Sequence, residues 1–243
     1  VFGRNATGGL VNVITPDPSF TLQGNVSAGV GFMREGAVSY DYRGYLTGPI
    51  SDNIAADFAV LYRDDGDYVT DLVNGGTFDG QRTISARSKV LITPSSSVRL
   101  IFTAGYMDIE GEIPNQPFKM QAISRDAPGV IIADAPWTGA LDVVPTADMD
   151  RLDLSLRAEI DLGGVTLEST TSYRNSHVTQ IADSDATNIF VALSELRNAN
   201  QKEYGQEVRL LSNSSSPLEW TAGLSFFGLD GTMPFFVARN AGG

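Results

Sequence analysis

The pattern that decides the fold runs through residues 151–162, Arg151-Leu152-Asp153-Leu154-Ser155-Leu156-Arg157-Ala158-Glu159-Ile160-Asp161-Leu162. Every second side chain is apolar, and the side chains between them are charged or carry a hydroxyl group. Successive side chains of a β-strand point to opposite faces, so this stretch predicts a strand with one apolar face and one polar face. Such a strand separates an apolar environment from an aqueous one.

The same alternation recurs in eight further segments, which are residues 22–32, 38–46, 54–62, 83–92, 98–106, 165–174, 203–211 and 218–226. We therefore expect nine strands. Most have about the 9 to 11 residues that a tilted strand needs to cross a bilayer. No run approaches the roughly 18 consecutive apolar residues of a transmembrane helix.

The connections between these segments alternate in length. Short turns rich in Gly, Pro, Ser and Asn are expected at 48–53, 94–97, 163–164 and 213–217, and longer polar segments at 64–80, 111–148 and 180–200. The tight Arg34-Glu35-Gly36 turn is the exception. Short turns at one end and long loops at the other are typical of bacterial outer-membrane barrels. Aromatic residues near strand ends fit a membrane interface, although aromatics also favour strands in general: Phe20, Phe32, Tyr62, Tyr106, Tyr173, Tyr204, Trp220, Phe226 and Phe227.

Composition excludes several classes of protein. The 243 residues contain 17 Lys+Arg and 29 Asp+Glu, a formal net charge of −12, and no cysteine. The missing cysteine excludes disulfide scaffolds, thiolate zinc sites and cysteine nucleophiles. The acidic balance argues against a nucleic-acid partner, because such a partner requires a basic face. Charged residues make up 19% of the chain, below the roughly 25% usual for soluble domains.

The first fifteen residues follow a different pattern, Phe2-Gly3-Arg4-Asn5-Ala6-Thr7-Gly8-Gly9-Leu10-Val11-Asn12-Val13-Ile14-Thr15, and the break Pro16-Asp17-Pro18 follows them. A phosphate-binding loop would need Lys and then Ser or Thr after the second glycine, and Gly9 and Leu10 stand there instead. The string closely resembles the end of the plug domain in TonB-dependent outer-membrane receptors, where a GRNATGG-x-x-N-x-x-T run leads through a short linker into the first barrel strand.

The resemblance implies an all-β fold, a partial transmembrane antiparallel up-and-down β-barrel preceded by the last strand of a plug domain. Residues 1–15 would form the C-terminal end of the plug, and residues 16–243 would supply about nine strands of a larger, 22-stranded barrel with long extracellular loops. The chain is then expected to be a piece of a longer protein.

The function implied by the resemblance is energised uptake of a scarce ligand across the bacterial outer membrane. The resemblance implies ferric siderophores, cobalamin, haem or oligosaccharides as possible ligands. The implied partners are outer-membrane lipid, the TonB energy-transducing complex and a small-molecule or metal-chelate ligand. No cofactor, metal, nucleic acid or enzymatic activity is expected.

The candidate site residues are those of the plug–barrel junction motif: Gly3, Arg4, Asn5, Gly8, Gly9 and Asn12. The glycines give the backbone conformational freedom at the junction. Arg4 and Asn5 could anchor the plug by hydrogen bonds to inward-facing carboxylates. The alternative is that the motif serves turn geometry alone. The ligand-binding residues are not assigned, and the long 111–148 segment is where we expect ligand contacts.

Other features have more ordinary interpretations. The acidic residues of the expected loops could bind Ca²⁺, but without an EF-hand pattern a solvated loop surface is favoured: Asp64, Asp65, Asp67, Asp71, Asp142, Asp148, Asp150, Asp183 and Asp185. The single His177 has no second His or Cys for a transition metal and is expected near a strand end.

Three other functions compete with the receptor hypothesis. They are a passive porin-like channel, a soluble β-sandwich binding module and an outer-membrane hydrolase barrel. The junction motif argues against the first and the strand lengths against the second. The third lacks a visible nucleophile and base, because no G-x-S-x-G motif is present.

Overall fold

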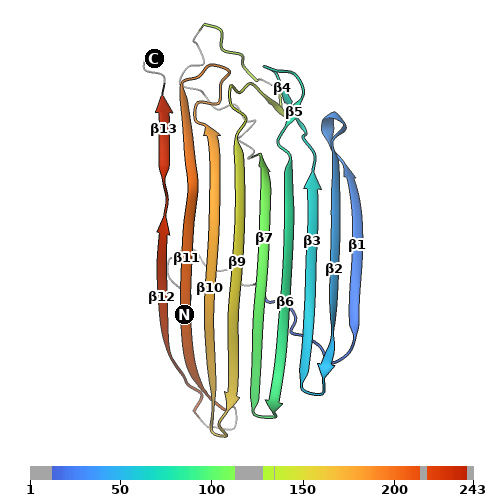
Figure 1. Cartoon of the computed structure of the whole chain (residues 1–243), viewed down its shortest axis with the longest axis vertical. Helices are drawn as coiled ribbons and strands as arrows, with labels where there is room; N and C mark the ends of the chain where they lie inside the picture. The colour runs from blue at the N-terminus through green and yellow to red at the C-terminus, as the bar shows by residue number, and fades with distance from the viewer. Residues whose placement is uncertain (1–12, 113–127, 134, 214–217, 240–243) are drawn as a thin grey trace.

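The computed structural model describes residues 13–112, 128–133, 135–213 and 218–239. Within them the chain forms one long antiparallel sheet, in which consecutive long strands lie side by side in chain order (Figure 1). Its nine long strands are β1 (Gln23–Phe32), β2 (Val38–Ser51), β3 (Ile54–Asp65), β6 (Gln81–Ser95), β7 (Val98–Glu112), β9 (Thr146–Asp161), β10 (Val165–Asp183), β11 (Ala192–Ser212) and β12 (Thr221–Thr232). All nine predicted strands are therefore present.

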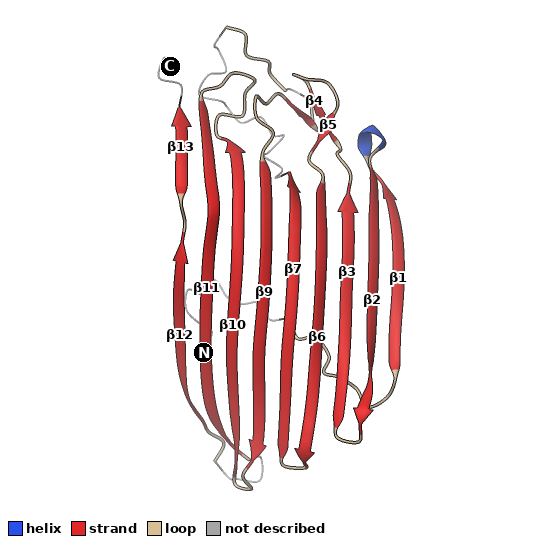
Figure 2. Cartoon of the chain, in the orientation of Figure 1, coloured by secondary structure: helices blue, strands red, loops and turns tan. Residues whose placement is uncertain are grey.

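Short elements lie at the end of the sheet that carries the long loops. They are the 3₁₀ turn η1 (Arg34–Gly36) and the strands β4 (Val69–Asp71), β5 (Thr77–Phe78), β8 (Thr138–Gly139) and β13 (Phe235–Arg239). Strands β5, β4 and β8 form a separate small sheet, and β13 pairs with the upper part of β11. Figure 2 shows β4 and β5 above the long strands, η1 joining β1 to β2, and β13 above β12 beside the upper part of β11. In the described part of the chain, no helix is long and apolar enough to span a membrane.

The predicted alternation of connection lengths is also present. Tight turns join β2 to β3, β6 to β7 and β9 to β10 at the lower end of Figure 1, and the longer connections gather at the other end. The predicted loops at 64–80 and 180–200 are too wide, because β3 continues to Asp65, β10 continues to Asp183 and β11 begins at Ala192. The last predicted strand is displaced, since β12 starts at Thr221 and runs on to Thr232.

The two faces of the sheet differ as the alternation predicts. Leu152, Leu156 and Phe102 lie on the apolar face, where Phe102 and Leu156 are cross-strand partners and are each 45% exposed. Asp153, Arg157 and Glu159 lie on the opposite, polar face. No second layer of protein covers the apolar side chains in the described residues, so lipid is their natural environment.

A row of tyrosines marks one border of the apolar face. Tyr62 pairs with Tyr42, and Tyr204 pairs with Tyr173, with ring centroids 6.2 and 5.3 Å apart. Tyr106 lies between these pairs, directly opposite Leu152. Amphipathic tyrosine rings favour membrane interfaces, so this row places one membrane boundary.

Charged side chains begin directly beyond the tyrosine row. Asp64 pairs across the strands with Arg82, and Arg82 pairs with Glu110. His177, which was expected near a strand end, lies inside β10, with Nδ1 3.0 Å from Asp150 Oδ2. The strands thus continue beyond the tyrosine row, because their backbone pairing does not end there.

A compact hydrophobic cluster lies among the loops at this end. Val69, Phe78 and Leu141 are buried there, and Tyr68 and Val144 pack against them. The loops therefore form a folded unit on top of the sheet.

Candidate functional site on the polar face

The predicted junction residues Gly3, Arg4, Asn5, Gly8, Gly9 and Asn12 lie outside the described residues. The segment that follows them, residues 13–22, is described, and we name it the linker. It runs behind the lower part of the sheet in Figure 1 and enters β1 at the edge. The polar face is therefore the face of the sheet against which the linker lies (Figure 1).

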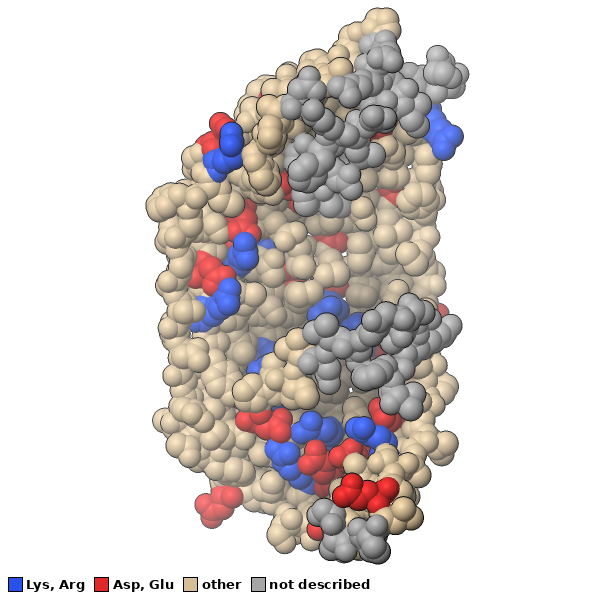
Figure 3. Space-filling model, turned by 180° about the vertical axis from the view of Figure 1, so that it is seen from behind, with Lys and Arg blue, Asp and Glu red and all other residues tan. Residues whose placement is uncertain are grey.

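One carboxylate of the linker lies among three cationic side chains of the sheet. Asp17 Oδ2 is 2.7 Å from Arg99 Nη2 of β7 and 3.1 Å from Arg157 Nη2 of β9. Asp17 Oδ1 is 3.5 Å from Lys89 Nζ of β6. Glu159 completes the group, at 3.4 Å from Arg99 and 3.1 Å from Arg157. We name these five residues the Asp17 cluster; Figure 3 shows basic and acidic side chains gathered on this face.

The linker backbone is bound as well. Lys89 Nζ donates hydrogen bonds to the carbonyl oxygens of Thr15 at 3.0 Å and Pro16 at 2.9 Å. Two residues beyond Asp17, the Ser19 N–H donates to Thr47 Oγ1 at 2.8 Å, and the Thr47 hydroxyl donates to the Ala56 carbonyl at 3.0 Å. The linker is thus tied to four strands: β2, β6, β7 and β9.

The electrostatics of the cluster favour an ionised Asp17. Partial burial opposes the charged form, but the hydrogen bond from Arg99 and the positive charges of Arg157, Arg99 and Lys89 outweigh it. The pKa of Asp17 is therefore below its ordinary value of 3.8. A hydrogen bond between ionised partners is among the stronger polar contacts in proteins.

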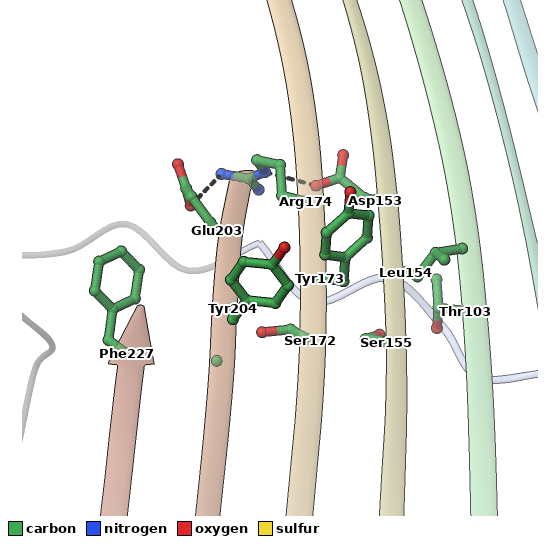
Figure 4. Close-up of a pocket in the computed structure, with 11 residues that line it drawn as sticks. Thr103, Asp153, Leu154, Ser155, Ser172, Tyr173, Arg174, Glu203, Tyr204 and Phe227 are labelled. Atoms are coloured by element: carbon green, nitrogen blue, oxygen red, sulfur yellow. Dashed lines mark hydrogen bonds and ion pairs between the residues drawn. The ribbon is translucent and has the colours of Figure 1, made fainter. Parts of the chain in front are cut away.

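A second row of charges crosses the polar face closer to the loops. Arg174 Nε is 2.6 Å from Asp153 Oδ1, and Arg174 Nη1 is 3.6 Å from Glu203 Oε2 (Figure 4). Beside this row is a hollow of about 280 Å³, lined on the polar face by small side chains: Thr103, Ser155, Ser172 and Gly205. Phe227, which was expected at a membrane interface, pairs with Gly205 and lines the same hollow.

The other arginines of the polar face also have acidic partners. Pairs are formed by Arg43 with Asp41, Arg63 with Asp65, Arg87 with Asp57, Arg151 with Asp153 and Arg209 with Glu168. The polar face therefore largely neutralises its own charge. It is a surface of paired acidic and basic side chains rather than a strongly cationic strip.

The comparisons with known proteins agree with this architecture. No protein-family model matches the chain. The pesticin receptors of Yersinia enterocolitica and Yersinia pestis are 29% identical over 96 residues, which is 39% of this chain and 14% of each relative. The crystal structure of the ferric yersiniabactin uptake receptor FyuA from Yersinia pestis superposes with a TM-score of 0.72 at 15% identity, and covers 94% of this chain and 35% of that receptor.

The chain is related to the TonB-dependent outer-membrane receptors. The described sheet accordingly matches part of the wall of an outer-membrane barrel. In such a wall the polar face is expected to line the lumen and the apolar face to meet lipid. The chain spans only about a third of the length of the solved receptor that it matches. These relatives are named as receptors, in agreement with the prediction of a non-enzymatic protein.

The loop end of the sheet contains several of the predicted acidic positions. Asp64, Asp148 and Asp150 lie in strands rather than in loops. Asp183, at the end of β10, and Asp185, in the following loop, are buried, at 3% and 6% exposure. The expectation of a solvated surface is therefore wrong for these two carboxyls. Among the described residues, no group of three His, Asp or Glu side chains is placed to hold a metal ion.

Sequence reasoning identified the inward position of Arg157 but not its partner. The expected anchor was a basic plug residue on inward carboxylates, whereas the linker contact has the opposite polarity, an acid held by wall cations. The sequence signal that could have predicted this contact is an acidic residue between two prolines, Asp17, together with three cationic residues at inward positions of later strands, Lys89, Arg99 and Arg157.

Proposed function

We propose that this chain supplies part of the wall and the plug junction of an energised outer-membrane receptor that imports a scarce metal chelate. The observation that carries the proposal is the linker, which is held against the luminal wall by the Asp17 cluster. A passive channel needs an open lumen, whereas a chain segment bound to the inner wall occupies part of it. The linker therefore favours a plugged receptor over a porin-like channel.

The ligand class is proposed from the relatives. One of them is named as an uptake receptor for a ferric siderophore, ferric yersiniabactin. We propose a ferric siderophore for this receptor and retain cobalamin and oligosaccharide as alternatives. The self-neutralising wall gives no reason to prefer a strongly anionic ligand, so we place discrimination between ligands in the extracellular loops.

The test uses the complete receptor in a host without its own iron-chelate receptors. Radiolabelled iron would be supplied as catecholate, hydroxamate or phenolate chelates, with labelled cobalamin and maltodextrin in parallel. We expect one iron chelate to be accumulated, and accumulation to stop when an uncoupler is added or the TonB protein is deleted. Uptake that continues without either energy source would support the passive channel and contradict the proposal.

The role of the junction motif remains a prediction. We propose that residues 1–15 end a plug domain, that Gly3, Gly8, Gly9 and Asn12 shape its last turn, and that Arg4 and Asn5 hold it to inward carboxylates. In the complete receptor, Arg4→Ala should lower uptake while ligand binding to whole cells is retained. Unchanged uptake would indicate that the motif serves only turn geometry.

A further inference from the structure

We propose that the Asp17 cluster is a permanent clip, which keeps the linker fixed to the barrel wall while the plug moves during transport. This inference rests on the proposed function, because it concerns the plug of an energised receptor and says which part of the chain stays in place when that plug moves. In this proposal Asp17 is a positioning residue, because it acts by holding the linker in place. The pivot of the plug would then lie on the N-terminal side of Thr15, and the segment between Thr15 and β1 would stay in place.

The first argument is the number and spread of the contacts. A single carboxylate meets cations from β6, β7 and β9, and Lys89 adds two hydrogen bonds to linker carbonyl groups. These strands are joined to one another by continuous backbone pairing. Pulling the linker away must therefore break five contacts to a rigid surface at the same time.

The second argument is charge balance. Lys89, Arg99 and Arg157 carry three positive charges, and Asp17 and Glu159 carry two negative charges. Without Asp17, three cations would face one carboxylate in the same group. Removing one partner from a partly buried ionic group leaves uncompensated charge, which makes the open state unfavourable.

The third argument is the stiffness of the linker. Pro16 and Pro18 flank Asp17, and proline fixes φ and restricts the residue before it. Pro18 is buried against the sheet, and Ser19 is bonded to Thr47 directly after it. The backbone on both sides of Asp17 is therefore restricted before the carboxylate meets the cations, so that less conformational freedom is lost when the linker binds the wall.

The test begins with Asp17→Asn in the complete receptor, compared with Asp52→Asn in the exposed β2–β3 turn and with Asp17→Glu as the conservative variant. Asparagine keeps the shape of the side chain and removes its charge. We expect Asp17→Asn to increase the passive entry of a small hydrophilic antibiotic severalfold, to lower energised uptake and to leave ligand binding unchanged. Asp17→Glu should restore most of the barrier, and Asp52→Asn should behave as wild type.

A reversible cross-link then distinguishes a permanent clip from one that opens. The double variant Asp17→Cys/Arg99→Cys would be joined by a short bis-thiosulfonate reagent that a reductant removes. A permanent clip predicts that the cross-link lowers the leak and restores uptake. Uptake that is lost on cross-linking and regained on reduction would overturn the proposal, and so would a leak that none of the Asp17 variants changes. Passive entry of the antibiotic requires no energy source, so it can be measured even when energised uptake is absent. A failure of the clip proposal can therefore be distinguished from a failure of the proposed function.

Discussion

Gly139 is a residue whose missing side chain allows the loops at one end of the sheet to pack. A Cβ at this position would overlap the ring of Phe78, which is 6% exposed in the cluster with Val69 and Leu141. The Gly139→Ala receptor should therefore lose about 1–3 kcal/mol of local stability, as is usual when a packed core is overfilled. Amide hydrogen exchange across residues 69–78 should become correspondingly faster.

Gly164 provides the matched control for that substitution. It lies in the β9–β10 turn at the other end of the sheet, and an added Cβ there would meet no atom within 4 Å. Gly164→Ala should leave exchange in the loops unchanged. Equal exchange in wild type and Gly139→Ala would show that the ring of Phe78 can move aside freely.

At the same scale, the sequence predicted the orientation of single side chains but not their partners. The period of two assigned Asp153, Arg157 and Glu159 to the polar face directly. The contacts of Asp17 with Arg99 and Arg157 join residues 82 and 140 positions apart. They depend on the register of several strands and on the path of the linker, which no local pattern encodes.

At the scale of the elements, the alternation located every long strand but underestimated the length of all of them except β1. In β7 the apolar face runs from Val98 to Tyr106, whereas the strand continues to Glu112. The signal depends on contact with lipid, so it ends at the tyrosine row. Backbone pairing continues beyond it, and there the apolar side chains change faces, to Met107 and Ile109, so they no longer extend the same apolar stripe.

The assignment of the two faces makes a prediction for neighbouring residues of β9. Leu156 lies midway along the apolar stretch from Leu152 to Ile160 and pairs with Phe102. Leu156→Arg in the complete receptor should cost about 2–4 kcal/mol of folding free energy, because the charge would lie near the bilayer centre. Unfolding by denaturant in lipid vesicles would measure this cost.

Ser155→Arg is the control, because its side chain would enter the luminal hollow of about 280 Å³. We expect this variant to fold with much less loss of stability. If both arginine variants were equally destabilised, the assignment of lipid and lumen to the two faces would be wrong.

A pH dependence belongs to the loop that follows β10. Asp183 lies ten residues beyond Tyr173, outside the membrane, and accepts hydrogen bonds from the N–H groups of Ala186 and Asp185. The pKa of Asp183 is raised to about 7, chiefly by burial. The hydrogen bond from the Ala186 N–H lowers this pKa, and the negative charges of Asp185 and Asp142 raise it further. The side chain of Asp142 is hydrogen-bonded to Asp183, which joins the β8–β9 and β10–β11 connections.

The sign of this effect follows from proton linkage. The folded loop holds the proton of Asp183 more tightly than the unfolded loop, whose carboxyl has the ordinary pKa of 3.8. The resulting stabilisation is complete below pH 3.8 and is lost as the pH rises through about 7. Exchange of the amides in residues 184–191, corrected for its intrinsic pH dependence, should be slower at pH 5 than at pH 8.

Asp183→Asn should remove that difference and protect the loop at pH 8. The amide keeps an oxygen for the two N–H groups and can donate to Asp142, as the protonated acid does. Asp52→Asn, in the β2–β3 turn at the other end of the sheet, is the control and should leave the difference in place. Exchange in wild type that is independent of pH would exclude the buried carboxyl as its cause.

At the scale of the whole molecule, the described sheet has two edges. Strand β1 pairs with β2 alone, and β12 pairs with β11 alone, so the backbone groups on their other sides have no partner strand among the described residues. A barrel wall in lipid must pair every such group, because hydrocarbon offers no hydrogen bonds. Closure therefore requires partners for the free edges of β1 and β12, and the solved receptor, of which this chain covers 35%, is long enough to supply further strands.

These edges predict the behaviour of the 243-residue chain when it is produced alone and refolded in detergent. We expect oligomers or aggregates that proteases digest, because an open edge with alternating apolar side chains pairs readily with a second copy. The complete receptor, refolded in the same detergent, should be monomeric and protease-resistant by gel filtration and limited trypsin digestion. A compact, protease-resistant monomer from the chain alone would contradict this prediction. It would mean that the two edges of the sheet meet, so that these strands form a small closed barrel and not part of a larger wall.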